Sequence, residues 1–258
     1  MIRFALIGAG RIGQMHAANI VAHDRCSLNW IYDVHAPSSE AVGAKTGAKV
    51  ARDPEEIFND ADVDAVFVAS STPTHADFIV RSVQSGKAVL CEKPIDLDIA
   101  KVEECSKQIS GAKSLIQIGF NRRFDPGHGQ LVGAVRNGEI GDLEQVIISS
   151  RDPEPPPKAY YLAAGGMLRD MTIHDFDLAR FALGEEVTQV TAFTSNLFDT
   201  VPVEPRHHGQ RRRHVPPREP FGGSSSSRRP VPAPEPSDPA RWRASDGEPC
   251  GPAMRHRS

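Results

Sequence analysis

Across the first 120 residues, short apolar segments alternate with segments of helical periodicity, and this alternation constrains the fold more than any other feature. Strands that are separated by helices pair in parallel through crossover connections. Apolar runs without polar alternation, such as 5–7 and 65–69, are typical of strands covered on both faces. We therefore predict an α/β fold, a doubly wound parallel sheet. Strands are expected at 2–7, 27–32, 48–51, 64–69, 88–90 and 114–118, and helices at 12–22, 37–45, 54–59, 74–85 and 97–110.

Three glycines follow the first expected strand with the spacing G-x-G-x-x-G. They are Gly8, Gly10 and Gly13, with Arg11 and Ile12 between the last two. Between a strand and a helix, such glycines permit a tight turn, a close approach of backbone to a pyrophosphate, and tight packing of helix on strand. The N-terminus of the following helix offers free N–H groups to the phosphates. A glycine turn that binds no phosphate is the alternative, and the position between strand and helix favours a dinucleotide.

An acidic residue, Asp33, ends the second expected strand about 20 residues beyond the glycine turn. A carboxylate at this point accepts hydrogen bonds from the adenosine ribose hydroxyls and repels a 2′-phosphate. The next residues, Val34 and His35, include no arginine that could receive such a phosphate. The pattern predicts NAD rather than NADP as cofactor. Alternatively, Asp33 caps a helix that begins near Pro37.

Composition and charge exclude several classes of protein. The first 204 residues carry 19 basic and 28 acidic side chains, which gives them no electrostatic case for binding nucleic acid. Apolar runs are all shorter than the roughly 18 residues that cross a bilayer, so we expect no membrane segment and no secretory leader. The four cysteines, Cys26, Cys91, Cys105 and Cys250, are scattered along the sequence. This argues against a disulfide framework and against a zinc module, and it favours a cytoplasmic location.

The composition changes abruptly near residue 205. Residues 205–258 contain 11 of the 30 basic residues, all arginine, and 11 of the 21 prolines, but no Leu, Ile, Lys, Tyr, Asn or Thr. Such a segment cannot build a core, and its composition predicts disorder. The missing residue types include several with AT-rich codons, whereas the enriched ones have GC-rich codons, which favours translation out of frame. The alternatives are a natural disordered tail and a basic nucleic-acid-binding arm.

Further polar residues are expected at the carboxyl edge of the sheet, where ligands of such folds bind. Lys93, in the segment Cys-Glu-Lys-Pro, follows the fifth expected strand and can reach a substrate oxygen there, although a solvated surface lysine is the alternative. Other chemistry-bearing residues follow the fourth strand, at 71–75, and occupy a later glycine-led segment, 165–177. Within that segment, Asp170, His174 and Asp177 are spaced by four and three residues and would share one helical face. Buried structural histidines and solvated acids are the common alternatives.

Together these motifs resemble the Gfo/Idh/MocA oxidoreductases, and within that family the inositol-oxidising members. The resemblance covers residues 1–204. It implies an NAD-binding Rossmann domain at 1–120 and a partial substrate and oligomerisation domain at 121–204, with an open antiparallel sheet that includes 143–149 and 187–196. In the family this sheet continues further. We therefore expect a homotetramer for a full-length relative, and a poorly stable or inactive product for this truncated chain.

The resemblance also implies roles for individual residues. Lys93, on a cis-like turn, would contact the reacting hydroxyl, and the pair Asp170 and His174 would transfer its proton. Arg122 and Asp177 would contact other hydroxyls of a polyol, with Ser150 or Arg151 near the same pocket. The implied cofactor contacts are Gly8, Gly10, Arg11, Ile12, Gly13, Asp33, Ser71, Thr72, Pro73, His75, Glu92 and Lys93.

The expected activity is NAD-dependent oxidation of a cyclic polyol, with myo-inositol as the leading substrate. The hydride chemistry belongs to the cofactor, and Asp170, His174 and Asp177 do not form a plausible closed zinc set, so no metal is expected. Two alternatives remain open. One is a dehydrogenase of another inositol isomer or sugar, and the other is a sensor that binds NAD without turning it over.

Overall fold

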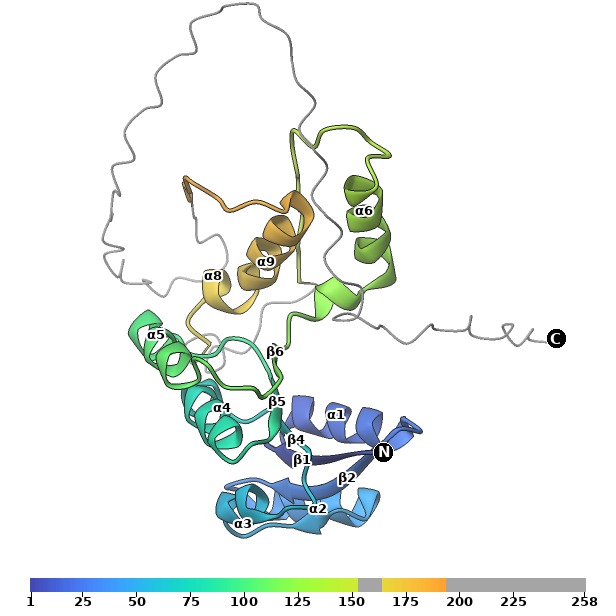
Figure 1. Ribbon diagram of the computed structural model, residues 1–258, viewed down its shortest axis with the longest axis vertical. Helices are drawn as coiled ribbons and strands as arrows, with labels where there is room; N and C mark the ends of the chain where they lie inside the picture. Colours follow the sequence, from blue (N-terminus) through green and yellow to red (C-terminus); the bar gives the residue numbers. More distant parts are fainter. Residues whose placement is uncertain (153–163, 194–258) are drawn as a thin grey trace, which may run out of the picture. The chain divides into compact units, whose positions relative to one another are not determined.

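A computed structural model describes residues 1–152 and 164–193, which lie in one compact unit, Met1–Phe193 (Figure 1). The segment 205–258, predicted as an out-of-frame or disordered tail, lies outside the described residues. None of the helices in the described part of the chain is long and apolar enough to span a membrane.

Six strands form a single parallel sheet in the order β3-β2-β1-β4-β5-β6. The order reverses between β1 and β4, which is the arrangement of a doubly wound Rossmann sheet. Each strand lies within a residue or two of its expected position, so the predicted fold class is confirmed for this part. The strands are β1 Ile2–Ile7, β2 Cys26–Tyr32, β3 Lys49–Val50, β4 Ala65–Val68, β5 Ala88–Cys91 and β6 Ile116–Ile118.

Helices connect the strands at the predicted places, and local signals fix several of their ends. Asp53 and Glu56 form a capping box at the start of α3, and Asp98 accepts a hydrogen bond from the Ala100 N–H at the start of α5. Gly47 ends α2 in the left-handed conformation, with φ of 77°. The helices are α1 Arg11–Ala22, α2 Ala36–Thr46, α3 Pro54–Asn59, α4 His75–Gln84 and α5 Ile99–Gln108, with a 3₁₀ turn, η1, at Thr72–Thr74.

Alternate side chains of the central strands enter two separate apolar clusters. Ala5 and Ile7 of β1 belong to one cluster, which includes residues of α3, α4 and α5, whereas Leu6 belongs to the other, which includes residues of α1 and α2. Phe67 of β4 is likewise separated from its neighbours Val66 and Val68. Because adjacent residues of a strand point to opposite faces, helices cover both faces of the sheet. This explains why the central strands lack polar alternation.

The regular elements described after β6 are all helices. Val132 of α6 and Leu178 and Ala182 of α9 are buried. The structure assigns no strand to 143–149 or 187–193, in contrast to expectation, and 194–196 lies outside the described residues. A strand exists only through its hydrogen-bonded partner, and the described residues supply none here. The antiparallel sheet and the boundary near 120 stay predictions. The elements are η2 Asn121–Phe124, α6 Pro126–Arg136, α8 Met167–Asp170 and α9 Thr172–Leu183.

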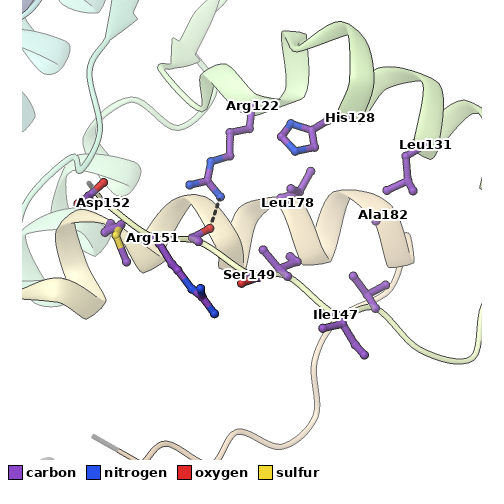
Figure 2. Close-up of a pocket in the computed structure, with 13 residues that line it drawn as sticks. Arg122, His128, Leu131, Ile147, Ser149, Arg151, Asp152, Leu178 and Ala182 are labelled. Carbon is purple, nitrogen blue, oxygen red and sulfur yellow. Dashed lines mark hydrogen bonds between the residues drawn. The ribbon is translucent and has the colours of Figure 1, made fainter. Parts of the chain in front are cut away.

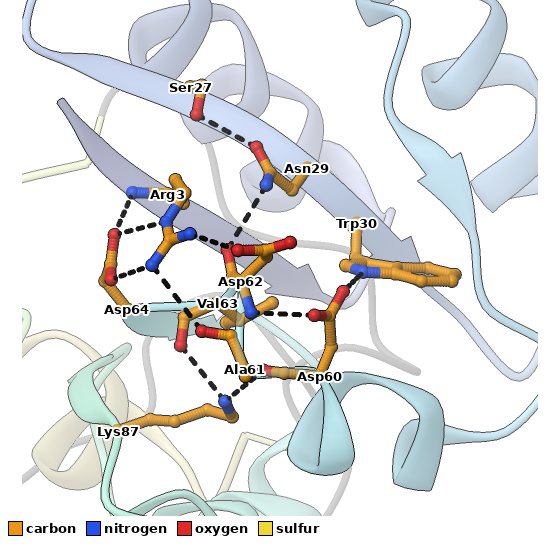
Figure 3. Close-up of polar contacts among 10 residues, drawn as sticks. All are labelled: Arg3, Ser27, Asn29, Trp30, Asp60, Ala61, Asp62, Val63, Asp64 and Lys87. Carbon is orange, nitrogen blue, oxygen red and sulfur yellow. Dashed lines mark hydrogen bonds and ion pairs between the residues drawn. The ribbon is translucent and has the colours of Figure 1, made fainter.

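A buried lysine holds the turn that precedes β4. Lys87 is 5% exposed, and its ammonium donates to the carbonyl oxygens of Asp60 at 2.6 Å and Val63 at 3.0 Å (Figure 3). Burial lowers the pKa of Lys87. Nearby, the Arg3 guanidinium binds the Asp64 carboxylate and holds its pKa well below the usual range. These bonds satisfy backbone groups of the turn and fix where β4 begins.

Replacing Lys87 by Met should lower the free energy of unfolding by about 2 kcal/mol, because two carbonyl oxygens lose a charged donor while a similar apolar stem remains. Urea unfolding measures the loss. Lys101→Met is the matched control, since that side chain is 60% exposed and pairs with Asp96 at 3.7 Å. Equal losses in the two variants would contradict the role assigned to Lys87.

Candidate active site

The glycine turn after β1 combines two tightly packed glycines with one that faces open space. Gly8 has a φ of 105°, and a Cβ there would lie 2.4 Å from the carbonyl carbon of Ala69. A Cβ on Gly13 would lie 1.9 Å from the carbonyl oxygen of Gly8. A Cβ on Gly10, directly before α1, would meet nothing within 4 Å. The turn therefore leaves room for a ligand at Gly10 and the helix N-terminus, which fits a pyrophosphate.

Asp33 connects the end of β2 to the glycine turn. One carboxylate oxygen accepts from the Ala9 N–H at 2.6 Å and the other from the His35 N–H at 2.8 Å. His35, not Asp33, precedes α2 as its N-cap residue, so the alternative interpretation of Asp33 as the helix cap is wrong. A carboxylate oxygen has two lone pairs, so both oxygens can still accept from ribose hydroxyls.

A cavity of about 490 Å³ lies beside Asp33 and is also lined by Tyr32, Val34, Glu40 and Arg52. Arg52 lies in the segment after β3 and was not singled out from the sequence, where only the residues next to Asp33 were weighed. The sequence did place Arg52 just after an expected strand, at the same edge of the sheet as Asp33. A guanidinium can accommodate the 2′-phosphate of NADP, so Arg52 beside Asp33 counts against the predicted preference for NAD.

The segment after β4 places exposed and buried residues side by side. Ser71 and Pro73 are exposed and Thr72 is half-buried, as expected of residues open to a cofactor. His75 is instead 2% exposed, and its ring nitrogens lie 2.8 Å from the Pro94 carbonyl oxygen and 3.0 Å from that of Ser70. The ring is thus occupied by the protein backbone, unlike the cofactor contact that the resemblance implied.

Lys93 follows β5 and reaches the residues of α8. The Lys93–Pro94 peptide bond is cis, in agreement with the expected turn. The ammonium donates to the Asp170 carbonyl oxygen at 2.7 Å and to its carboxylate at 2.9 Å. The side chains of Lys93 and Asp170 are 15% and 26% exposed. This contact brings together two of the three predicted catalytic residues.

Glu92 is engaged by α1. Its carboxylate accepts from His16 Nε2 at 3.1 Å, and the His16 ring stacks on Phe67 with centroids 4.1 Å apart. Burial alone would raise the pKa of Glu92, but the hydrogen bond from His16 and the charge of Lys93 lower it. Glu92 therefore carries a negative charge beside Lys93. His16, on the helix that follows the glycine turn, was not singled out from the sequence.

His174 lies near the Lys93–Asp170 contact. Its ring meets the edge of Phe120 at 6.5 Å between centroids, and Nδ1 is buried with no hydrogen-bond partner among the described residues. Burial, followed by the charges of Lys93 and Arg122, lowers the pKa of His174, while Glu92 and Asp170 partly oppose this shift. A neutral imidazole near neutral pH can accept a proton.

The helix expected to carry three site residues on one face is interrupted. Asp170 ends α8, Met171 lies between the helices, and α9 begins at Thr172. Asp170 therefore does not share one continuous helix with His174 and Asp177. Residues spaced by four share a face only if the helix is continuous between them, and the spacing alone cannot reveal a break at a single residue such as Met171.

Arg122 and Asp177, expected to contact substrate together, have different partners. Arg123 donates to both oxygens of Asp177, at 2.8 Å and 2.6 Å, and Asp177 is 6% exposed. Arg122 pairs with Asp175. The sequence cannot show which of the two neighbouring arginines pairs with which aspartate of α9, because the pairing depends on how α9 lies against η2. Arg123 and Asp175 were therefore missed.

Arg122, Asp175 and Ser150 form one polar cluster, called here the Arg122 cluster. The Ser150 hydroxyl donates to Asp175 at 2.6 Å and accepts from Arg122 at 3.2 Å. The cluster borders a cavity of about 510 Å³ between α6, α9 and the segment 146–152 (Figure 2). Arg151 lines the same cavity with its side chain directed away from Arg122. Of the two candidates at 150 and 151, Ser150 thus joins the predicted site residues.

Among residues 1–152 and 164–193, no group of three or more His, Cys, Asp or Glu side chains is arranged to hold a metal ion.

Comparison with known protein families identifies the chain. Residues 2–120 match the model of an oxidoreductase family with an NAD-binding Rossmann fold, GFO_IDH_MocA, and residues 129–210 match the GFO/IDH/MocA C-terminal domain. The chain belongs to the Gfo/Idh/MocA family. Its N-terminal part is therefore an NAD-binding Rossmann domain.

Similar members of the Gfo/Idh/MocA family act on inositols, according to their names. An inositol 2-dehydrogenase of Rhizobium meliloti is 46% identical over 198 residues, which are 77% of this chain and 60% of that protein. A myo-inositol 2-dehydrogenase of Thermotoga maritima is 43% identical over 77% of this chain and 60% of its own. The chain thus spans about 60% of the length of these relatives.

Solved structures of inositol dehydrogenases are also similar to this chain. A putative myo-inositol dehydrogenase from Sinorhizobium meliloti superposes with a TM-score of 0.69 at 47% identity, over 72% of this chain and 56% of that one. A scyllo-inositol dehydrogenase from Lactobacillus casei, with bound NAD(H) and scyllo-inositol, gives a TM-score of 0.61 at 30% identity, over 72% and 57% of the two chains.

Two glycine substitutions should separate cofactor binding from folding in this Gfo/Idh/MocA chain. Gly10→Ala should leave the thermal midpoint unchanged, since its Cβ meets no protein atom, but weaken NAD binding about tenfold by filling the approach to the pyrophosphate. Gly13→Ala should unfold the domain at lower temperature, because its Cβ collides with Gly8. Calorimetric titration with NAD and thermal scans measure both. Unchanged NAD affinity in Gly10→Ala would place the pyrophosphate elsewhere.

Proposed function

We propose that this protein oxidises a cyclic polyol, myo-inositol first of all, by transferring a hydride to NAD. The observation that carries the proposal is the contact between Lys93 and Asp170, with His174 close enough for the Lys93 charge to lower its pKa. An ammonium, a carboxylate and an imidazole at the carboxyl edge of a cofactor-binding sheet suit oxidation of an alcohol. The names of the similar proteins support an inositol as that alcohol.

In this mechanism His174 accepts the proton of the reacting hydroxyl. Its lowered pKa keeps the imidazole neutral, and the nearby Asp170 carboxylate stabilises the imidazolium that forms. The Lys93 ammonium stabilises the negative charge that develops on the substrate oxygen. Bound NAD supplies the acceptor for the hydride that leaves the carbon, and a ketone results. The oxygen-bound proton and the carbon-bound hydride thus have separate acceptors.

The residues present fit NAD. The open space at Gly10 and the N-terminus of α1 would receive the pyrophosphate, and Asp33 would accept from the ribose hydroxyls. Ser71, Thr72 and Pro73 would border the cofactor at the end of β4. We propose NAD rather than NADP, because a 2′-phosphate would meet the Asp33 carboxylate, although Arg52 lines the same cavity.

The Arg122 cluster would contact hydroxyls remote from the reacting carbon. Its guanidinium can donate to a polyol, and Ser150 and Asp175 orient it. Asp177 would act through Arg123, whose two hydrogen bonds fix α9 to η2. Related sugars and other inositol isomers remain alternative substrates, and scyllo-inositol is the first of these, since a similar protein binds it.

We also propose a cytoplasmic location and, for a full-length relative, a homotetramer. The cysteines of the described residues, Cys26, Cys91 and Cys105, are free, in keeping with a reducing compartment. Light scattering of the purified chain beside a full-length relative tests the assembly. A monodisperse, active tetramer of the present chain would contradict the expectation that the chain is poorly stable or inactive.

Substitution of His174 by Gln should lower kcat for myo-inositol about 10²- to 10⁴-fold, because the amide cannot accept the proton. NADH absorbance measures turnover, and calorimetry checks that NAD still binds. His23→Gln is the matched control, since that histidine lies at the end of α1 with a side chain 48% exposed. Because the truncated chain is expected to be inactive, these assays use the chain with its reading frame restored beyond residue 204. If that protein binds NAD but no inositol or sugar yields NADH, a sensor replaces the enzyme.

The rate should depend on the protonation of His174. The base must be neutral, and its pKa lies below the usual value of 6.5, so kcat/KM should fall only as pH drops below about 6.5. Glu92→Gln should move this midpoint still lower, because the Glu92 carboxylate raises the pKa of His174. Proton NMR titration of the His174 ring gives the same midpoint without turnover. A midpoint above the usual value would contradict the assigned environment.

A further inference from the structure

His75 is the most deeply buried histidine in the described residues and contacts two separate backbone segments. The side chain opens α4 and is 2% exposed. Nδ1 lies 2.8 Å from the carbonyl oxygen of Pro94, and Nε2 lies 3.0 Å from that of Ser70. Neither oxygen can donate, so the ring is the donor. A neutral imidazole donates from one nitrogen and a protonated ring from both, so in either state the ring binds at least one of the two carbonyls.

The two carbonyl groups belong to segments that leave adjacent strands. Ser70 follows β4 and Pro94 follows β5, and these strands are paired as far as Val68 and Cys91. One more hydrogen bond, from the Glu92 N–H to the Val68 carbonyl oxygen at 2.9 Å, extends the ladder. Beyond it, the polar contact between these two segments in the described residues is that of His75 Nδ1 with the Pro94 carbonyl oxygen.

Lys93 lies between these two attachments. On its N-terminal side, Glu92 is held by the Val68 carbonyl and by His16. On its C-terminal side, the Pro94 carbonyl oxygen lies 2.8 Å from Nδ1 of His75, the shorter of the two ring contacts. A lysine side chain is a flexible four-carbon stem, so the position of its ammonium is defined only if its backbone is fixed. The attachment of Pro94 thus bears directly on whether the ammonium meets Asp170.

From these contacts we propose that His75 is a positioning residue that joins the segment after β4 to the turn after β5 and thereby fixes Lys93. This inference deepens the proposed function and rests on it only for its effect on catalysis. It assigns the ring to the backbone of the site, where the resemblance implied a direct contact with the cofactor. The geometric part, in which His75 restrains Lys93, stands on hydrogen bonds alone.

A pair of variants on one helix separates positioning from stability. His75→Phe keeps a buried ring of similar shape and removes every hydrogen bond that the imidazole donates. Ser82→Ala, on the same helix, removes a bond of similar kind, because the buried Ser82 hydroxyl donates to the Phe78 carbonyl oxygen at 2.7 Å. Both variants should lower the urea midpoint. His75→Gln, whose amide still offers two donors, should restore part of what His75→Phe loses.

The decisive readout is the acylation rate of Lys93, followed by mass spectrometry with acetyl N-hydroxysuccinimide and compared with the exposed Lys101 in the same sample. His75→Phe should raise the relative rate about fivefold, the factor equivalent to one average hydrogen bond of about 1 kcal/mol. Ser82→Ala should leave it unchanged, and His75→Gln should lie between. If His75→Phe does not fold, His75→Leu takes its place, because an unchanged Lys93 rate in a folded variant without a donor at this position overturns the proposal.

Turnover provides the second readout. With NAD and myo-inositol, His75→Phe should lower kcat more than it raises KM and should increase the isotope effect with substrate deuterated at the reacting carbon, because hydride transfer becomes slower. Equal kinetics and equal Lys93 labelling in His75→Phe and Ser82→Ala would overturn the inference. If the unaltered chain oxidises no polyol, as is expected of a truncated chain, the labelling result still decides whether His75 restrains Lys93, independently of the proposed function.

Discussion

The parallel pairing of β1, β4 and β5 is the constraint on which the rest of this structure depends. Parallel strands end at the same edge of a sheet, so three segments distant in sequence begin side by side there. The close contact of Gly8 with Ala69 shows how tightly the first two are packed, since no side chain fits between them. The glycine turn, the segment after β4 and the Lys93 turn therefore meet without any direct sequence signal linking them.

Charges organise the site around this edge. Lys93 lies between two carboxylates, bonding directly to Asp170 and lowering the pKa of Glu92, which keeps the lysine paired without burying an isolated charge. The same cation, together with burial and Arg122, disfavours protonation of His174. A single lysine thus serves both functions in the proposed mechanism, as a partner for developing negative charge and as a reason for the imidazole to stay neutral.

The region after β6 combines buried and exposed apolar side chains. Buried residues of α6 and α9 coexist with apolar side chains that are largely exposed, among them Ile147 at 81% and Phe193 at 94%. The chain spans about 60% of the length of similar inositol dehydrogenases. Apolar surface of this kind stabilises a protein only when something covers it, which is the physical basis for expecting low stability.

The sequence by itself determined the Rossmann sheet, the glycine turn, Asp33 at the end of β2 and Lys93 at the end of β5. These features depend on local periodicity and on residues adjacent to strand ends, which a linear pattern records. Only the tertiary structure decided that His75 binds backbone carbonyls, that α8 and α9 separate at Met171, and that Arg122 pairs with Asp175 while Arg123 pairs with Asp177. Each of these outcomes depends on which of several chemically equivalent neighbours comes within hydrogen-bonding distance, and that is set by the packing of elements far apart in the chain.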